Sequence, residues 1–262
     1  MPTSEQYYFP FGQPLRKVQQ SDRSPKRVFV LGVYASAVHA RWVDSEGKQK
    51  IAALAVASEP EIFWTGADAG IIFSAIKLPK ELGQLKLPTN AGLNGPSGRA
   101  LDERILKPLK FSRQAAWLCD LLPESRVNVQ QRKVIDKYYT QDIVSRYGLK
   151  SATVPDFDEQ ELNSAERRQQ ILEELELSKA ETLILLGNMP INWFLRFFTD
   201  NKYSLLSQFG ETNETYGKEH ELKINGKLYK VIPLCHPRQA DRLGVSSEKW
   251  GKLHDHWLLN HS

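Results

Sequence analysis

The sequence has few cysteines and no long apolar run. Cys119 and Cys235 are its two cysteines in 262 residues, too few for a disulfide framework or for a cluster with four thiolate ligands. No stretch reaches the roughly 18 apolar residues of a membrane-spanning helix. The first residues, MPTSEQYYFPFG, lack the basic segment and apolar core of a secretory signal. We therefore expect a cytoplasmic protein that makes no membrane contact.

Common cofactor and nucleotide motifs are also absent. Gly32 follows an apolar run, but it is not part of a Gly-x-Gly-x-x-Gly pattern, and no Gly-Lys-Ser/Thr of a phosphate-binding loop occurs. His254 and His256 are two residues apart. Residues at that spacing on a helix do not share a face, which disfavours a metal pair. The sequence predicts neither a cofactor nor a metal cluster.

What is present indicates a soluble globular protein. Hydrophobic residues make up 41% and charged residues 25% of the chain, and the formal net charge is +4. A mildly basic balance permits binding to nucleic acid, although many unrelated enzymes share it. Composition alone therefore leaves the function open.

Buried strands and helices alternate along the chain. Nearly continuous apolar runs predict strands at 27–33, 115–122, 181–187 and 227–235, and helical periodicity predicts helices at 97–109, 163–177, 188–198 and 246–259. This alternation is typical of an α/β fold with three layers, in which helices cover both faces of a parallel sheet. We expect a single domain spanning 1–262, with insertions near 43–90 and 123–163.

Both insertions follow the carboxyl end of a strand, where ligands bind in open α/β sheets. The first predicted strand opens at Gly32 onto a dense group of side chains able to donate, accept, stack or carry charge. This group comprises Tyr34, Ser36, His39, Arg41 and Trp42. We expect this group to lie at the mouth of a site.

Several stretches, in this order, resemble the uracil-DNA glycosylase superfamily. They are VLGVYAS (30–36), AGLNGPSGRALDERIL (91–106), WLCDLLPESRVN (117–128), and the pair LILLGNMP (183–190) and VIPLCHPRQ (231–239). The resemblance implies a four-stranded parallel sheet in the order 2-1-3-4. It also implies an enzyme that takes a base out of the DNA stack and hydrolyses its N-glycosidic bond, as base-excision repair requires.

The resemblance assigns roles to two residues at strand ends. His236 matches the histidine that donates to the carbonyl oxygen of the leaving base; a capping or core histidine is the alternative. Asp120 stands where the family has an asparagine that reads the edge of the base. Because an ionised aspartate only accepts hydrogen bonds, we hypothesise a base with an exocyclic amino group, such as cytosine. Alternatively, Asp120 pairs with Arg126 or Arg41 and reads nothing.

The first catalytic loop departs from the family. Members commonly carry Asp, Asn or Glu there to place the attacking water, whereas the residues after Gly32 include no carboxylate. Tyr34 or His39 is left to hold the water or to wall the pocket, although a phenol is a poor base at neutral pH. Leu93 stands where related members have the phenylalanine that stacks on the base, so Tyr34, Trp42 or Trp64 would have to supply the ring, with core packing as the alternative for each.

Further candidates follow from the matched segments. Gly32, Leu93, Asn94 and Asn188 are assigned to the base pocket, with Asn188 also a possible helix cap. Ser97 is assigned to DNA contact or, alternatively, to a helix cap. In the loops after the second and fourth predicted strands, the candidate DNA contacts are Arg126, Arg238, Gln239 and Arg242. The alternative for the arginines is a solvated surface role.

Three functions remain open. The first is a glycosylase acting on single- or double-stranded DNA. The second is a non-catalytic nucleic-acid-binding protein of the same fold, and the third is a hydrolase of a small nucleoside or nucleotide. A Cys235–His236 thiol–imidazole pair is disfavoured, because neighbouring residues of a strand point to opposite faces.

Overall fold

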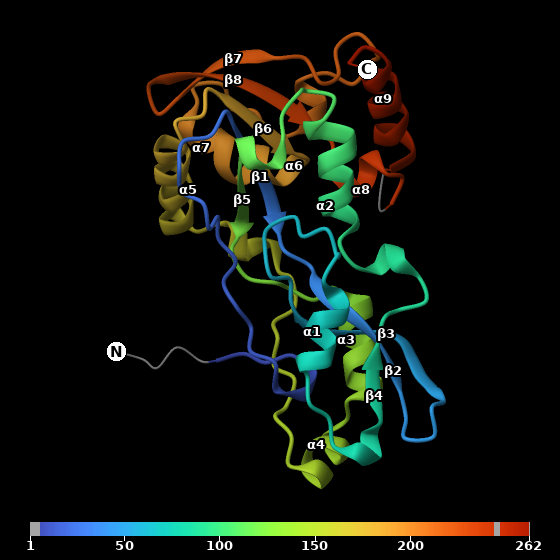
Figure 1. The fold of residues 1–262 in the computed structure, drawn as a ribbon. Helices are drawn as coiled ribbons and strands as arrows, with labels where there is room; N and C mark the ends of the chain where they lie inside the picture. The colour runs from blue at the N-terminus through green and yellow to red at the C-terminus, as the bar shows by residue number, and fades with distance from the viewer. Residues whose placement is uncertain (1–5, 244–246, 262) are drawn as a thin grey trace.

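A computed structural model describes residues 6–243 and 247–261. Its larger sheet has the strand order β5-β1-β6-β8-β7 (Figure 1). Four strands run parallel: β1 (Val28–Tyr34), β5 (Ala116–Leu122), β6 (Thr182–Leu186) and β8 (Lys227–Leu234). The last strand, β7 (His220–Ile224), is antiparallel to β8. The protein is therefore of the α/β type, with a mostly parallel central sheet.

The sheet has five strands, so the prediction of four was wrong, and the complete strand order differs from the predicted one. The added strand is the edge strand β7. Its residues alternate between buried Leu222 and Ile224 and exposed Glu221 and Lys223. A strand covered on one face lacks the continuous apolar run by which the other four were identified. Taken in chain order, those four parallel strands lie as second, first, third and fourth.

Helices flank this sheet near the predicted positions. The segment predicted as a helix at 188–198 is one continuous helix with a π-helical turn, and the helix predicted at 97–109 ends at Leu106. Ser246, the predicted start of the last helix, lies outside the described residues. The flanking elements are α2 (Pro96–Leu101), η4 (Asp102–Leu106), α5 (Ala165–Ser178), α6 (Asn188–Pro190), η7 (Ile191–Leu195), α7 (Arg196–Phe198), α8 (Pro237–Ala240) and α9 (Ser247–Leu259).

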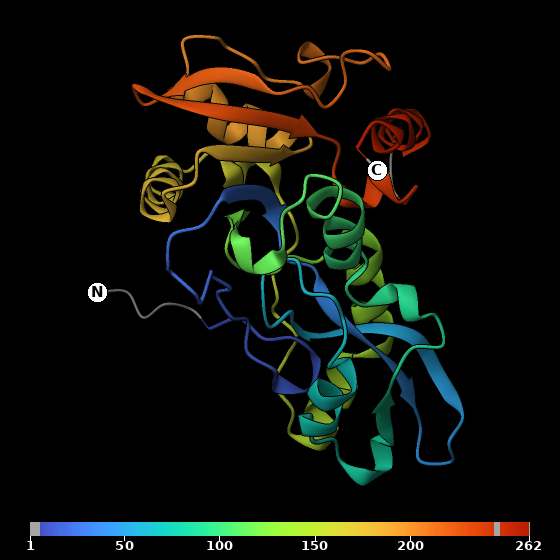
Figure 2. The same ribbon diagram turned by 45° about the horizontal axis from the view of Figure 1, so that its top comes forward.

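A second, antiparallel sheet lies beyond the carboxyl end of β1 (Figure 2). It has the order β3-β2-β4 and consists of β2 (Ala37–Val43), β3 (Gln49–Ser58) and β4 (Gln84–Lys86). Three helices pack around it: α1 (Ala69–Ala75), α3 (Val129–Tyr138) and α4 (Gln141–Tyr147). Short 3-10 turns are η1 (Pro10–Gly12), η2 (Lys80–Leu82), η3 (Ala91–Leu93), η5 (Arg113–Ala115), η6 (Glu159–Leu162) and η8 (Leu206–Gln208).

The second sheet has its own apolar core, separate from the core around β1. Trp42 is fully buried in it, donates from Nε1 to the backbone oxygen of Leu82, and meets the Phe11 ring edge-on at 5.2 Å. Both insertions contribute to this core: Leu54 comes from the first and Ile135 from the second. The two insertions thus fold together into one lobe.

The lobe corrects one expectation about the chain after Tyr34. We expected a loop from Tyr34 to His39, but only Ala35 and Ser36 separate β1 from β2. His39 therefore lies within a strand. None of the described helices is both long and apolar enough to cross a membrane.

Candidate functional site

The parallel strands end at a common edge, where the residues of interest gather. Gly32 of β1 pairs in register with Asp120 of β5. His236 follows the end of β8, and Gly187 follows the end of β6 and donates its N–H to Leu234 O at 2.8 Å. Parallel strands bring their carboxyl ends to the same side, which is why residues so distant in sequence meet here.

Gly32 leaves room for two other side chains. A Cβ at this position would lie 2.3 Å from Asp120 Oδ1 and 2.6 Å from Phe63 Cζ. Any side chain here would displace the carboxylate, the ring or both. The absence of a side chain at Gly32 therefore lets the Asp120 carboxylate and the Phe63 ring approach each other over β1.

Phe63 is held firmly and was not predicted as a site residue. Its backbone lies in the left-handed region, at φ 52°, and its carbonyl accepts from Arg113 Nη2 at 2.8 Å. A Cβ at Gly98 would lie 2.1 Å from the same carbonyl oxygen, so the Gly-Pro-Ser-Gly segment packs directly on the backbone of Phe63. Leu93, assigned to the base pocket from sequence, is half-buried in η3.

Glu59 supplies a second buried carboxylate. It follows β3, is 7% exposed, and lies near enough to the backbone N–H of Ser36 for that group to lower its pKa slightly. Burial raises its pKa to about 8, with a further contribution from the charge of Asp120. Burial also raises the pKa of Asp120 to about 7, although Arg167 acts in the opposite direction. The two carboxyl groups therefore titrate near neutral pH.

Sequence reasoning missed Glu59 because it searched the residues that directly follow Gly32. Glu59 comes from the inserted segment and reaches the strand edge through β2 and β3. The one available signal was an acidic residue between the apolar end of a strand and Pro60. Among the described residues, Asp120 forms no ion pair with Arg126 or Arg41, the alternative raised from sequence.

His236 is held as a neutral imidazole. It is the N-cap of α8, and its Nδ1 accepts from the backbone N–H of Arg238 at 3.3 Å. Burial lowers its pKa to about 4, and the nearby Arg238 lowers it further. Because Nδ1 accepts, the single proton of the neutral ring resides on Nε2. His236 can therefore donate a hydrogen bond from Nε2.

In His39 the ring proton is on the other nitrogen from that in His236. Gln131 Oε1 accepts from the backbone N–H of Asn128 at 2.7 Å, which directs the Gln131 amide nitrogen to His39 Nε2 at 2.9 Å. His39 Nε2 therefore accepts, and the ring proton resides on the buried Nδ1. Burial lowers the pKa of His39 to about 4. The ring links β2 to α3, and its Nε2 lone pair is already engaged.

Tyr34 forms part of the wall beside these groups. Its ring stacks on Phe157 with centroids 4.7 Å apart. Burial raises the pKa of Tyr34, while Arg238 and Arg126 partly offset the rise. The side chain remains a neutral phenol at physiological pH, which fits a wall better than a base.

The predicted polar contacts of the base pocket are largely engaged within the protein. Asn94 Oδ1 accepts from the backbone N–H of His39 at 2.8 Å, and Asn94 Nδ2 donates to the backbone oxygen of His39 at 2.9 Å. Asn188 Oδ1 accepts from the backbone N–H of Leu206 at 2.8 Å. Ser97 is half-buried at the start of α2. Asn94 and Asn188 thus hold the loops that surround the site.

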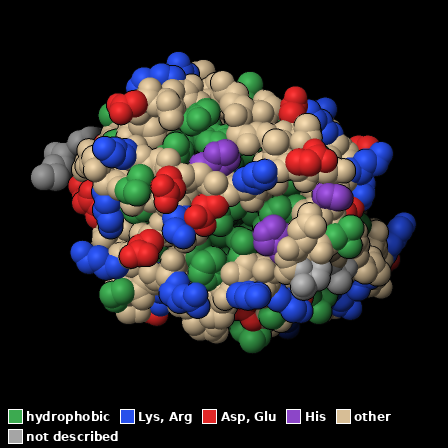
Figure 3. Space-filling view, turned by 90° about the horizontal axis from the view of Figure 1, so that it is seen from above, with side chains coloured by type: hydrophobic (Ala, Val, Ile, Leu, Met, Phe, Trp, Pro, Cys, Tyr) green, Lys and Arg blue, Asp and Glu red, His purple; other side chains and the backbone are tan. Residues whose placement is uncertain are grey.

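Of the residues predicted to contact DNA, some are bound to other groups of the protein and one is exposed. Arg126 pairs with Glu161 at 2.7 Å, and Arg242 pairs with Asp255 at 2.5 Å. Gln239 Oε1 accepts from the backbone N–H of His236 at 3.2 Å. Arg238 is exposed. Figure 3 shows basic and acidic side chains interspersed over the face seen from above.

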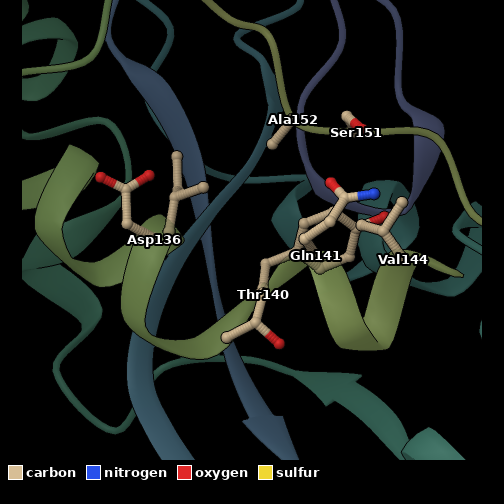
Figure 4. Close-up of a pocket in the computed structure, with 8 residues that line it drawn as sticks. Asp136, Thr140, Gln141, Val144, Ser151 and Ala152 are labelled. Carbon is tan, nitrogen blue, oxygen red and sulfur yellow. The ribbon is translucent and has the colours of Figure 1, made fainter. Parts of the chain in front are cut away.

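A separate hollow lies in the second lobe, away from these residues. It has a volume of about 240 Å³ and lies between α3, α4 and the segment that carries Ser151 and Ala152 (Figure 4). None of the residues assigned from sequence lines it. Its lining contains no pair of buried titratable groups, so we place the candidate site at the strand edge.

The site contains no evident metal centre. Within residues 6–243 and 247–261, no group of three or more His, Cys, Asp or Glu side chains could hold a metal ion. Both cysteines are buried and unpaired. No protein-family model matches the chain, and no curated protein matches it.

Proposed function

We propose that this protein is an N-glycosyl hydrolase that excises a flipped base from DNA, in the manner of uracil-DNA glycosylases. The observation that carries the proposal is the pair of buried carboxylates, Glu59 and Asp120, at the strand edge that also bears His236. Hydrolysis of an N-glycosidic bond needs an edge reader, a group that orients water, and a donor to the leaving base. The residues at this edge offer one of each.

The roles divide as follows. The Phe63 ring stacks on the base, and Asp120 meets its edge. Glu59 orients the attacking water and accepts its proton while the water oxygen bonds to the sugar carbon. The electrons of the N-glycosidic bond pass to the base, and His236 Nε2–H stabilises the charge on the base oxygen. Because the pKa of Glu59 is about 8, its base form is a minor species at pH 7, and we expect the excision rate to rise with pH towards 8.

Glu59 resolves the main difficulty of the first loop. That loop lacks a carboxylate, but the pairing of Ala37 with Ser58 brings Glu59 next to Ser36, which lies in the loop. The carboxylate that the loop lacks is thus supplied by the second lobe. Tyr34 then needs no catalytic role and serves as a wall.

An excision assay tests this function. DNA oligonucleotides with uracil, hypoxanthine, xanthine, cytosine or alkylated bases, single- and double-stranded, would be treated with the protein and with His236→Ala, Glu59→Gln and Asp120→Asn. We expect Glu59→Gln and His236→Ala to lower the excision rate by about 10²- to 10⁴-fold. Glu173→Gln, an exposed change of the same chemistry on α5, is the matched control. Full activity of Glu59→Gln would remove its assigned role.

A second candidate is a hydrolase of free nucleosides. The ion pairs of Arg126 and Arg242 favour it, because those cations are already neutralised and the predicted basic track for DNA is interrupted. Salt separates the two functions. A DNA enzyme should lose affinity for oligonucleotides as salt rises, whereas a nucleoside hydrolase should cleave free nucleosides with little dependence on salt.

A further inference from the structure

A second hollow lies in the lobe built from the two insertions, where α1 packs beside the edge strand β4 (Figure 1). It has a volume of about 310 Å³. One wall is formed by α1 and the chain just after it, from Gly70 to Leu78, and the other by β4 and its neighbours, from Gly83 to Leu87. None of the residues assigned to the candidate active site lines it.

The outer edge of β4 has no partner strand. In the sheet order β3-β2-β4, β4 pairs with β2 on one side only. Within residues 6–243 and 247–261, no hydrogen bond joins the backbone of Gln84, Leu85 or Lys86 to a group outside that ladder. Because alternate residues of a strand direct their N–H and C=O groups away from the neighbouring strand, β4 presents unpaired backbone groups at this edge. Such an edge can pair with another chain.

The hollow is apolar on the side of α1. Leu85 lies opposite Trp42 in the ladder and packs against the same apolar core as Phe73 of α1. The helix α1 therefore covers the face of the sheet on which Leu85 lies. Two large hydrophobic side chains of these walls remain exposed, Leu87 at 57% and Ile71 at 72%. Apolar side chains of a bound segment would cover them.

The rim of the hollow is basic. Residues 69–87 contain three lysines, Lys77, Lys80 and Lys86, against one acidic residue, Glu81, which gives a net charge of +2. All three lysines are exposed. In the part of the chain that the structure describes, none of them forms an ion pair. The charge of this rim is complementary to an acidic ligand.

Lys86 also continues a row of positive charge across the sheet. It lies opposite Arg41 of β2, and paired residues project from the same face of a sheet. Arg41 Nε is buried and has no hydrogen-bond partner. Like charges directly opposite each other destabilise a sheet. A carboxylate beside Lys86 on an added strand would offset both charges.

We propose that β4 binds an extended acidic segment of a partner protein, which adds as a fourth strand to the smaller sheet. The backbone of the segment pairs with the outer edge of β4, and its side chains give specificity. The residue beside Lys86 is acidic because it shares the face of Lys86 and Arg41. Its two neighbours point to the opposite face, towards Leu85 and α1, and are apolar. The recognised pattern is therefore apolar–acidic–apolar, and it holds whether or not the protein excises bases.

Other occupants fit this edge less well. A second copy of the chain could pair through its own β4, but Gln84, Leu85 and Lys86 offer no carboxylate to face Lys86. A nucleic acid could neutralise the lysines, but it cannot extend the hydrogen-bond ladder of β4. Both occupants are outcomes of the experiment below.

The probe is a short synthetic peptide with blocked ends in which valine alternates with glutamate. Added to the ¹⁵N-labelled protein, it should shift the amide signals of β4 and of the residues around the hollow. A peptide that alternates valine with lysine is the matched control and should bind at least about 10-fold more weakly. Absence of shifts at β4 with millimolar glutamate peptide would overturn the proposal.

Two methylated peptides test the strand pairing itself. One carries N-methyl groups on its valines and the other on its glutamates. A strand added at an edge pairs through the N–H groups of alternate residues only, so one of these peptides should lose binding and the other should keep it. Equal affinity of the two would overturn strand addition.

Variants test the hollow and its charge. Lys86→Glu should weaken binding of the glutamate peptide about 5- to 10-fold and strengthen binding of the lysine peptide. Ser74→Trp, an exposed change on α1 in the wall of the hollow, should abolish binding of the glutamate peptide. Ser145→Trp, an exposed change on α4, is the matched control and should bind this peptide as the wild type does. Unchanged affinity of Lys86→Glu or of Ser74→Trp would overturn the proposal.

Two further results would reassign the edge. Shifts at β4 that grow with protein concentration in the absence of peptide would assign it to a second copy of the chain. Shifts at the same amides with a DNA oligonucleotide, and none with the glutamate peptide, would assign the lysines to nucleic acid. Either result would overturn the proposal.

Discussion

The larger and the smaller sheet each bring a buried carboxylate to the same strand edge, and they do so by different means. Asp120 lies within β5, the edge strand that runs parallel to β1, and every residue of this strand is buried. Glu59 follows an antiparallel strand of a lobe assembled from two insertions. In the proposed mechanism, the larger sheet supplies the base reader and the donor to the leaving base, and the smaller sheet supplies the carboxylate that the first loop lacks. An insertion can thus complete a site as well as cover it.

Among the packing changes, Gly32→Ala should cause the largest loss, because its new Cβ falls where Asp120 of β5 and Phe63 of the first insertion approach each other. The new Cβ would fall 2.3 Å from Asp120 Oδ1 and 2.6 Å from the Phe63 ring. We expect excision to fall by about 100-fold through misplacement of the reader. Urea unfolding should show a destabilisation of about 1–3 kcal/mol from overpacking. Gly70→Ala in α1, where a Cβ meets no atom within 4 Å, is the control; equal kcat/KM for the two variants would contradict this packing.

Glu59→Gln should change how stability depends on pH. The folded-state pKa of Glu59 is about 8 and its ordinary value is 4.5, so the folded protein keeps a proton that the unfolded chain loses. The free energy of unfolding therefore falls as pH rises from about 4.5 to 8, at up to roughly 1.4 kcal/mol per pH unit. Because glutamine does not titrate, the free energy of unfolding of Glu59→Gln should not show this decline with pH.

The measurement is urea unfolding of both proteins from pH 6.5 to pH 8. Histidines with pKa values near 4, such as His236 and His254, alter stability only below their ordinary value of about 6.5, so this window avoids them. We expect the stability of Glu59→Gln relative to wild type to grow by about 2 kcal/mol across the window. A constant difference would show that Glu59 is ionised throughout.

Tyr216→Phe tests how the larger sheet holds its histidine loop. The backbone N–H of Cys235 donates to the Tyr216 hydroxyl at 3.0 Å, and this hydroxyl donates to His254 Nδ1 at 2.9 Å. The donor direction follows because His254 Nε2 donates to the backbone oxygen of Arg104. Removing the hydroxyl leaves two buried groups unpaired, at a cost of about 1–3 kcal/mol.

Hydrogen exchange separates this effect from general destabilisation. The amide of Cys235 should lose protection in Tyr216→Phe by more than the amides of β2 in the smaller sheet. Uniform loss of protection in both sheets would mean that the hydroxyl supports the whole fold rather than the histidine loop. Because Cys235 precedes His236, we also expect a lower kcat with little change in KM.

The same contrast explains what the sequence could predict. β1, β5 and β6 were readable because almost every position along them is buried and apolar, and residues 231–234 of β8 share this pattern. The smaller sheet could not be recognised from the sequence, because β3 begins with exposed residues and β2 carries His39 and Arg41 between apolar positions. Asp120 and His236 were proposed from local motifs. Phe63 reaches Gly32 only through the packing of α2, and Glu59 is brought next to the start of β2 only by the pairing of β2 with β3.

The smallest effect is expected from a matched pair of turn glycines, one in each sheet. Gly47 lies between β2 and β3, and Gly226 lies between β7 and β8. Both have φ 82°, and a Cβ at either would meet no atom within 4 Å. Alanine therefore adds only the cost of a left-handed backbone, about 1–2 kcal/mol in each case. Neither change should alter excision.

The pair also shows whether the two sheets unfold as one unit. If they do, Gly47→Ala and Gly226→Ala should lower the protection of buried amides in both sheets by the same factor, about 5- to 30-fold. If the smaller lobe opens by itself, Gly47→Ala should deprotect β2 and β3 and leave β1 and β6 unchanged. Independent opening would move Glu59 away from the end of β1 without unfolding the larger sheet, and the proposed site would then be complete only in the closed form.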